Sequence, residues 1–256
     1  MNAISRLIIS KKIKRILCLL LLFSVIIGAF SIHHKTFKPG YLNAGDDHIH
    51  VAYSNELKKI WNEENRVLGW SKLYSTGAPI FMLRPPGFYI VTNIISFITG
   101  LTIEESLKVA VAFGFCLFPL SIFICGRLLG LGFGASFFAG LIAPLPISLW
   151  GHSIDAYQYL GIHKQLFAIL IFPIAVGSLW RLMKNGDCGL LYALCFPFMF
   201  VTHPYIAYSF FLTVPFMVVA LISQETDWDW KKGLLHCIMW SVPAFFFLSF
   251  WLIPFV

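Results

Sequence analysis

Long apolar runs separated by short polar segments dominate the chain from residue 16 to its end. A transmembrane helix needs about 20 mainly apolar residues, and several of these runs approach that length. The pattern predicts membrane-spanning helices at residues 16–32, 106–125, 131–149, 166–182, 190–202, 205–222 and 234–256. Transmembrane β-barrels would instead show short segments of alternating polarity. The predicted fold class is therefore an all-α, polytopic membrane protein with about seven transmembrane helices.

The polar segment after the first run contains two shorter helical patterns. Residues 86–99 would form a helix only about 21 Å long, short of the roughly 30 Å hydrocarbon core, so we expect a juxtamembrane helix. Further upstream, Val51, Leu57, Ile60 and Trp61 recur at approximately helical spacing. This spacing predicts an amphipathic helix that lies along the membrane surface.

Basic residues indicate the orientation of the chain. They concentrate before the first run and in short loops, at Arg6, Lys11, Lys12, Lys14, Arg15, Arg127, Arg181, Lys184, Lys231 and Lys232. Cytoplasmic loops are enriched in Lys and Arg, so we expect a multi-pass protein of the cell membrane with a cytoplasmic N-terminus and an external first loop. A cleavable signal peptide is the alternative for the first run, because Ala29-Phe30-Ser31 resembles a cleavage site.

One membrane domain, residues 1–256, accounts for the pattern. It comprises an external loop with juxtamembrane helices at residues 33–105 and a helical bundle at residues 106–256. The sequence ends within the last apolar run, at Val256, which leads us to expect a truncated bundle from the N-terminal part of a longer protein.

Composition supports the membrane class and narrows the partners. Hydrophobic residues make up 58% of the chain and charged residues 12%, whereas soluble domains are roughly 45–50% apolar. The net charge of +7 comes from residues that membrane topology explains, so we expect membrane lipid and no nucleic acid as a partner. In such a chain ionisable residues are costly, and each is a functional candidate by default.

The segment Gly45-Asp46-Asp47-His48-Ile49-His50 concentrates such residues directly after the first apolar run and its short linker. Three interpretations fit it. One aspartate can cap the following helix, worth about 1 kcal/mol. Asp46 and His50, four residues apart, can pair as general base and orienting partner, so the catalytic candidates are Asp46, Asp47 and His50. Asp46, Asp47, His48 and His50 also suit a divalent metal, the one cofactor that the sequence suggests.

The order of segments resembles a known family. After the acidic segment come Trp70, Gly77-Ala78-Pro79-Ile80-Phe81, Pro85-Pro86 with Phe88-Tyr89, and a run that ends in Gly126-Arg127-Leu128-Leu129-Gly130. This order is similar to the start of the GT-C class of polyprenyl-dependent membrane glycosyltransferases. Within that class it most resembles membrane proteins labelled 6-pyruvoyl-tetrahydropterin synthase-related, a label that does not imply pterin chemistry. The Asp46-to-His50 spacing, residues 161–168 and Thr202-His203-Pro204 carry the same resemblance.

The resemblance implies sugar transfer from a lipid-linked, polyprenyl-phosphate donor at the external membrane face, with an aspartate of the first loop as base. A carboxylate can deprotonate an acceptor hydroxyl, and cationic side chains can neutralise a leaving phosphate. Arg84 is the candidate phosphate partner, and an interfacial arginine that pairs with lipid headgroups is the alternative role for it. Asp155, His163 and His203 are further candidates for substrate binding. Gln165 stands where the family pattern has Glu.

Two other function classes stay open at this point. A transporter or lipid-handling protein favours ionisable residues or broken helices near the bilayer midplane, whereas Asp155 and the histidines map to span ends. A noncatalytic membrane scaffold would tolerate the loss of both Asp46 and Asp47.

Overall fold

The computed structural model describes residues 11–32, 45–73, 77–143, 161–224 and 228–252. In these ranges the chain is helical apart from turns and one isolated antiparallel bridge between Ser71 and Ala78. The helices are α1 (Lys11–Ile32), α2 (Asp47–Glu64), α3 (Ile80–Leu83), α4 (Gly87–Thr99), α5 (Ile103–Cys116), α6 (Phe118–Leu128), α7 (Phe133–Ile142), α8 (His163–Asn185), α9 (Gly189–Thr202), α10 (Pro204–Gln224) and α11 (Trp230–Leu252). The predicted all-α class is confirmed for the described residues.

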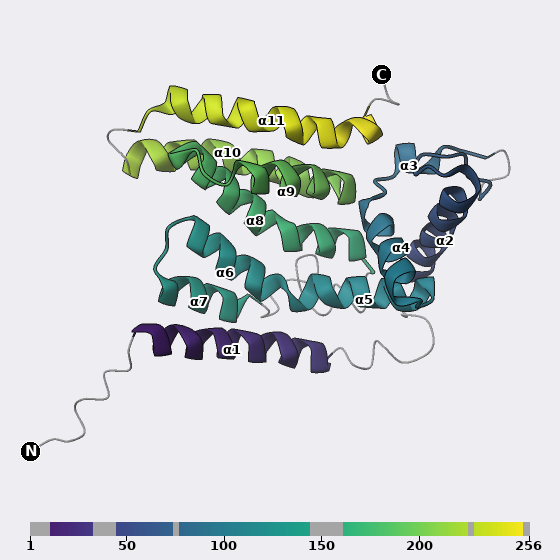
Figure 1. Cartoon of the computed structure of the whole chain (residues 1–256), viewed down its shortest axis with the longest axis horizontal. Helices are drawn as coiled ribbons and strands as arrows, with labels where there is room; N and C mark the ends of the chain where they lie inside the picture. Colours follow the sequence, from purple (N-terminus) through teal and green to yellow (C-terminus); the bar gives the residue numbers. More distant parts are fainter. Residues whose placement is uncertain (1–10, 33–44, 74–76, 144–160, 225–227, 253–256) are drawn as a thin grey trace, which may run out of the picture.

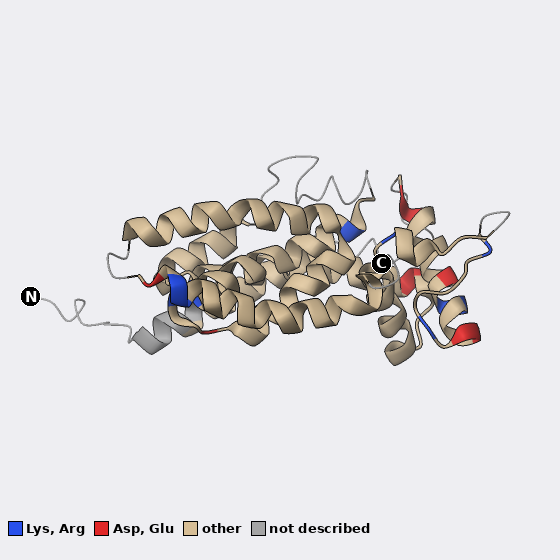
Figure 2. Ribbon diagram, turned by 90° about the horizontal axis from the view of Figure 1, so that it is seen from above, with Lys and Arg blue, Asp and Glu red and all other residues tan. Residues whose placement is uncertain are grey.

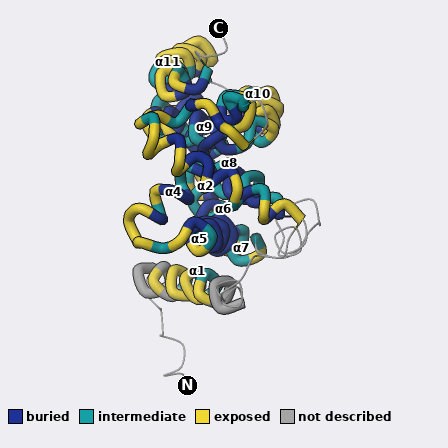
Figure 3. The backbone as a smooth tube through the Cα atoms, turned by 90° about the vertical axis from the view of Figure 1, so that its right-hand side faces the viewer, coloured by how far each residue is buried: buried dark blue, intermediate teal, exposed yellow. Residues whose placement is uncertain are grey.

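The helices other than α2, α3 and α4 lie side by side along one direction, and those three cover one end of the bundle (Figure 1). We call this the first-loop end. Helix α8 lies at the centre of the bundle, in contact with α5, α6, α9, α10 and α11. Buried residues follow this central region, while exposed residues cover much of α10 and α11 (Figure 3).

Contacts between distant residues show which helix ends meet. At the first-loop end, the indole nitrogen of Trp251 donates a hydrogen bond to the Phe81 carbonyl at 2.8 Å. At the opposite end, the indole nitrogen of Trp228 donates to the Met183 carbonyl at 3.1 Å. The turns α6–α7 and α8–α9 lie at this opposite end, as do the end of α10 and the start of α11 (Figure 1). We call it the basic end, because Arg127 and Arg181 belong to it. Charged residues gather at the two ends and leave the middle of the bundle uncharged (Figure 2).

Three helices of the described chain, α8, α10 and α11, are long and apolar enough to cross a membrane, and the bent pair α5–α6 adds a fourth if it counts as one span. Large apolar side chains on these helices face outward, such as Phe216 and Phe246, each 76% exposed. Apolar helices of this length with apolar outer faces indicate a helical membrane protein. Seven spans and their orientation stay predictions.

The span predicted at residues 106–125 is not one straight helix. Helices α5 and α6 meet at Leu117 with a bend of 42°. Pro119 lies in the first turn of α6, where its missing N–H and its ring are tolerated, although they break a continuous helix. Gly177 of α8 lets α6 approach closely, since a Cβ there would lie 2.8 Å from the Leu128 Cβ.

The amphipathic helix predicted after the acidic segment is α2, and most of its apolar side faces protein. Tyr53, Leu57 and Ile60 are buried in one cluster with residues of α3, α4 and α5, including Phe81 and Phe88. The short helices α3 and α4 supply an apolar surface that the sequence pattern of α2 alone does not reveal, whereas Trp61, the fourth apolar residue of the pattern, is 38% exposed. The position of α2 along the membrane surface stays a prediction. The predicted short helix at residues 86–99 corresponds to α4.

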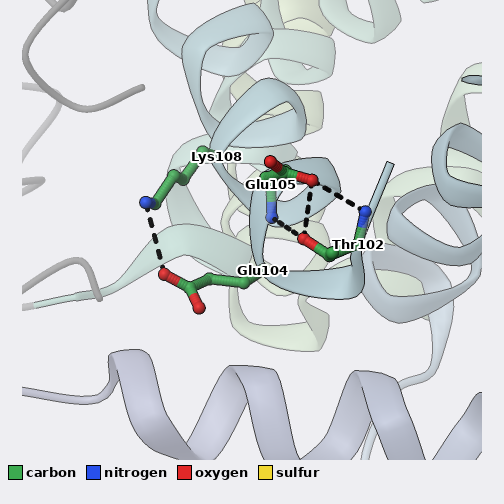
Figure 4. A network of polar contacts seen from close by, with 4 residues as sticks. All are labelled: Thr102, Glu104, Glu105 and Lys108. Atoms are coloured by element: carbon green, nitrogen blue, oxygen red, sulfur yellow. Dashed lines mark hydrogen bonds and ion pairs between the residues drawn. The ribbon is translucent and has the colours of Figure 1, made fainter. Parts of the chain in front are cut away.

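Helix α5 starts with a capping box (Figure 4). The Glu105 amide donates to the Thr102 hydroxyl at 3.2 Å, and the Thr102 amide donates to the Glu105 carboxylate at 2.9 Å. One turn later, Lys108 pairs with Glu104 at 3.3 Å. Helix α4 ends at Thr99, and the next residue, Gly100, has a left-handed backbone with φ +72°. The chain turns there, and the capping box starts α5 directly after this turn.

Candidate functional site

Two residues far apart in the sequence, an aspartate and a histidine, meet in a buried contact at the first-loop end. Asp47 is the first residue of α2 and His163 the first residue of α8, and the Asp47 Oδ1 contacts the His163 Nε2. Both residues are only 1% exposed. Removing one partner of a buried polar contact destabilises the protein, since the other group stays buried without this contact. Asp47 therefore fastens α2 to α8, and substrate does not reach its carboxylate in this arrangement.

His50, one turn further along α2, is held between two groups. Its Nε2 lies 2.9 Å from the Gly161 carbonyl and its Nδ1 lies 3.2 Å from the Tyr89 hydroxyl. A carbonyl only accepts, so Nε2 carries the proton and Nδ1 accepts from the hydroxyl. Burial, reinforced by nearby cationic groups, lowers the pKa of His50 to about 3. His50 is therefore neutral, and it does not form the predicted side-chain pair with Asp46, because its ring is turned to Gly161 and Tyr89.

Asp46 is exposed, whereas the neighbouring Asp47 is buried against His163. Asp46 occupies the N-cap position of α2, yet its side chain makes no capping hydrogen bond. The residue is exposed, and within the described residues its carboxylate forms neither a hydrogen bond nor an ion pair. Its charge acts on both Tyr89 and Lys164. Asp46 is thus an accessible carboxylate at the edge of a polar cluster.

Two cations lie in the same cluster, each above an aromatic ring. The Arg84 guanidinium is 5.0 Å from the centre of the Tyr53 ring, and the Lys164 ammonium is 5.7 Å from the centre of the Tyr89 ring. The two rings are themselves 5.7 Å apart. Neither cation forms an ion pair with a carboxylate in the described part of the chain. Cation–π contacts of this kind position a charge without neutralising it, so both cations are available to an anion.

Lys164, Tyr89 and Tyr53 did not emerge as site residues from the sequence. A signal for Lys164 was present, because it directly follows His163 at a span end predicted to be external, where lysine is uncommon in short loops. Tyr89 was part of the segment with Pro85-Pro86 and Phe88 that carries the family resemblance, whereas no sequence pattern pointed to a site role for Tyr53. Their roles arise because α2, α4 and α8 meet at the first-loop end.

His203 lies at the end of α9, close to Lys164. Burial and the positive charge of Lys164 lower the pKa of His203 to about 4. Its ring packs 5.8 Å from that of Tyr205, and its Nδ1 is buried without a hydrogen-bond partner in the described ranges. His203 therefore borders the cluster as a neutral group. Asp155, the remaining substrate-binding candidate, lies outside the described residues.

The predicted metal ligands do not form one coordination group. His48 and Asp46 are exposed, whereas Asp47 and His50 are buried in separate contacts. Within the ranges that the structure describes, no three His, Cys, Asp or Glu residues are arranged to hold a metal ion. The described residues thus offer no support for a metal at this segment.

An apolar cavity of about 240 Å³ lies between α4, α9 and α11. Gly87 lines it, three positions after Arg84, and the other lining residues are Ile90, Leu194, Pro197, Phe198, Val201, Phe247 and Phe250. Helix α4 approaches α9 closely here, since a Cβ on Gly87 would lie 2.7 Å from the Thr202 hydroxyl. The cavity therefore lies next to the segment that carries Arg84.

Together these features define an all-helical membrane protein with a polar, partly exposed cluster at one end of its bundle. Comparison with family models, with curated proteins and with solved structures finds no match to the chain.

Proposed function

We propose that the chain is a GT-C-like membrane glycosyltransferase that transfers a sugar from a polyprenyl-phosphate donor to an acceptor hydroxyl at the external membrane face. The observation that carries this proposal is the accessible Asp46 carboxylate beside two cations, Arg84 and Lys164, that lack carboxylate partners in the described chain. A base and an anion-binding pair at one site are what such a transfer requires.

In the proposed reaction Asp46 accepts the proton of the acceptor hydroxyl as its oxygen attacks the anomeric carbon. The bond between that carbon and the donor phosphate oxygen breaks, and a glycosidic bond to the acceptor forms. The polyprenyl phosphate leaves with the bonding electron pair. Arg84 and Lys164 stabilise the phosphate charge as it develops.

Asp47, His163 and His50 take positioning roles in this mechanism. The Asp47–His163 pair holds the first turn of α2 against α8, and so sets where Asp46 projects. His50 holds the Tyr89 hydroxyl and the Gly161 carbonyl. This network keeps the tyrosine under Lys164 in one orientation, which preorganises the cation for an anionic group.

The apolar cavity beside Gly87 offers a place for the first isoprenoid units of the donor. It is lined by apolar side chains of α4, α9 and α11, and the α9 residue at its edge, Val201, is two positions before His203. A lipid whose phosphate lies near Arg84 would direct its chain into this cavity. With the N-terminus cytoplasmic and seven crossings, the first-loop end and its cluster face outside.

The test is sugar transfer by membranes that contain the chain, supplied with polyprenyl-phosphate sugars. Asp46→Asn is expected to remove transfer, and Arg84→Gln or Lys164→Gln to lower it by about 10²-fold. Glu63→Gln, which neutralises another exposed carboxylate of α2, is the matched control and should retain activity. Full transfer by Asp46→Asn would refute the role of the base. Absence of transfer in the wild type, with an intact complex containing a partner protein, would favour a scaffold.

A further inference from the structure

A second depression lies on α2 and α4, two of the helices that carry the polar cluster. It is a groove of about 430 Å³ between α2 and α4, lined by Lys58, Trp61, Asn62, Asn93, Ile94 and Phe97. This volume is within the range of roughly 300–1,000 Å³ found for ligand sites. None of the residues assigned to sugar transfer lines it.

Asn93 places a polar atom at the floor of the groove. The residue is 7% exposed, and its amide nitrogen donates to the Ser54 carbonyl at 3.0 Å and to the Tyr89 carbonyl at 2.9 Å. Both partners are carbonyls, so the side chain has a single orientation with the nitrogen toward them. The amide oxygen has no hydrogen-bond partner among the described residues, and it remains as an acceptor for a ligand that brings an O–H or N–H donor.

The wall of the groove is apolar and continues onto an exposed surface. Phe97 is 90% exposed, Ile94 42% and Trp61 38%, and Ile98 beside the groove is 74% exposed. Helix α4 lies at the first-loop end, to one side of the bundle (Figure 3). Exposed aromatic and aliphatic side chains on a short helix at the end of a membrane-spanning bundle belong in the interface between hydrocarbon and water.

Lys58 gives the groove a positive charge. Its ammonium lies 3.5 Å from the Ser96 hydroxyl, across the gap between α2 and α4, and no acidic residue lines the groove. Lys59, its neighbour, is exposed but does not line the groove. An anion in the groove would therefore meet one lysine and not the other.

We infer that this groove binds an anionic glycerophospholipid with a hydroxyl-bearing headgroup, such as phosphatidylglycerol. The phosphate pairs with Lys58, a headgroup hydroxyl donates to the Asn93 oxygen, and the upper acyl chain lies against Phe97, Ile94 and Trp61. A soluble glycan fits less well, because most of the lining surface is apolar. The inference does not depend on sugar transfer.

The test is native mass spectrometry of the detergent-solubilised chain with three added lipids. Phosphatidylglycerol should bind about tenfold more tightly than phosphatidylcholine, the effect of one charge-assisted contact. Phosphatidylmethanol, which is anionic but lacks the headgroup hydroxyls, should bind with intermediate affinity. Equal affinity for all three lipids would overturn the inference, and so would displacement of phosphatidylglycerol by a soluble disaccharide.

Matched variants locate the site. Lys58→Gln should reduce the preference for phosphatidylglycerol over phosphatidylcholine to the part that the headgroup hydroxyl supplies, whereas Lys59→Gln removes the same charge one position away and should preserve the full preference. Phe97→Asn should weaken the binding of both lipids, whereas Ile98→Asn should leave it unchanged. All four side chains are exposed, so folding should be unaffected. Equal effects of the two lysine variants, or unchanged binding in Phe97→Asn, would place the lipid elsewhere.

Discussion

Asp47 and His163 are 116 positions apart in the chain, yet their side chains form a buried carboxylate–imidazole contact that joins the first turn of α2 to the first turn of α8. Asp46, the adjacent residue, is exposed and makes no such contact within the described chain. Two neighbouring aspartates therefore have separable roles, one in holding the fold and one at the surface of the polar cluster.

Substitution of the two aspartates should separate these roles. Asp47→Asn removes the carboxylate that contacts a buried histidine and should lower the free energy of unfolding by about 1–3 kcal/mol. Asp46→Asn should change it by about 0.5 kcal/mol or less, as expected for an exposed position. Thermal unfolding in detergent micelles measures both. If the Asp47→Asn, His163→Gln double variant were destabilised by the full sum of the single effects, the two residues would not be coupled.

Stability should depend on pH through His50. Its pKa is lowered to about 3 in the folded protein, while an unfolded histidine titrates near 6.5. Between these values the unfolded chain binds the additional proton, so stability is complete above about pH 6.5 and is lost as the pH falls toward 3. His203, with its pKa lowered to about 4, acts in the same direction.

The measurement is the unfolding midpoint at several pH values for the wild type and for His50→Gln. The variant should show a shallower decline between pH 6.5 and pH 4, because it lacks one group that must be neutral in the folded state. Parallel pH curves for the two proteins would mean that His50 is not the source of the dependence.

Gly87→Ala should destabilise the contact between α4 and α9. The added Cβ would lie 2.7 Å from the Thr202 hydroxyl and 2.8 Å from the Val201 carbonyl, and overpacking of this kind costs about 1–3 kcal/mol. Gly134→Ala is the control, because a Cβ there meets nothing within 4 Å. A thermal midpoint that falls only for Gly87→Ala would agree with the close approach, and equal midpoints would contradict it.

The capping box at the start of α5 provides a local test. Thr102→Ala removes the hydroxyl that accepts the Glu105 amide and should lower stability by about 1 kcal/mol. Glu105→Gln keeps the side chain that reaches back to the Thr102 amide and should be nearly neutral. The measurement is denaturant unfolding of both variants. If Glu105→Gln were as unstable as Thr102→Ala, the result would contradict the capping box.

Membrane topology can be tested by labelling single cysteines in a background without the six native ones. Asn55 of α2 and Asn185 of α8 are both exposed, and they belong to opposite ends of the bundle. A membrane-impermeant reagent should label Asn55→Cys in intact cells and Asn185→Cys only after lysis. The reverse result would invert the proposed orientation.

Much of the helix pattern was predictable from hydropathy alone. The run at residues 190–202 became α9, Gly189–Thr202, and the run at residues 166–182 became α8, which starts earlier at His163 and ends later at Asn185. The difference arises because charged and polar residues at both ends of a span continue the helix beyond its apolar part. The bend before Pro119 was also predictable from the sequence, since proline inside an apolar run indicates a break in the helix.

The candidate site was predictable only in part. The residues at the start of α2 stood out by composition, but the spacing of Asp46 and His50 could not show that the His50 ring turns to Gly161 of another segment. The importance of Lys164 and Tyr89 likewise depends on how α4 meets α8. Such contacts join residues far apart in sequence, and single-helix periodicity holds no information about them.

The long sequence separation between Asp47 and His163 also constrains how the site is made. At about 5–20 residues per second of synthesis, the ribosome adds His163 roughly ten seconds after Asp47. During that interval α2 has left the ribosome without the histidine that anchors it. The polar cluster is therefore completed late in biogenesis, because α2 lacks this contact until the start of α8 has been made.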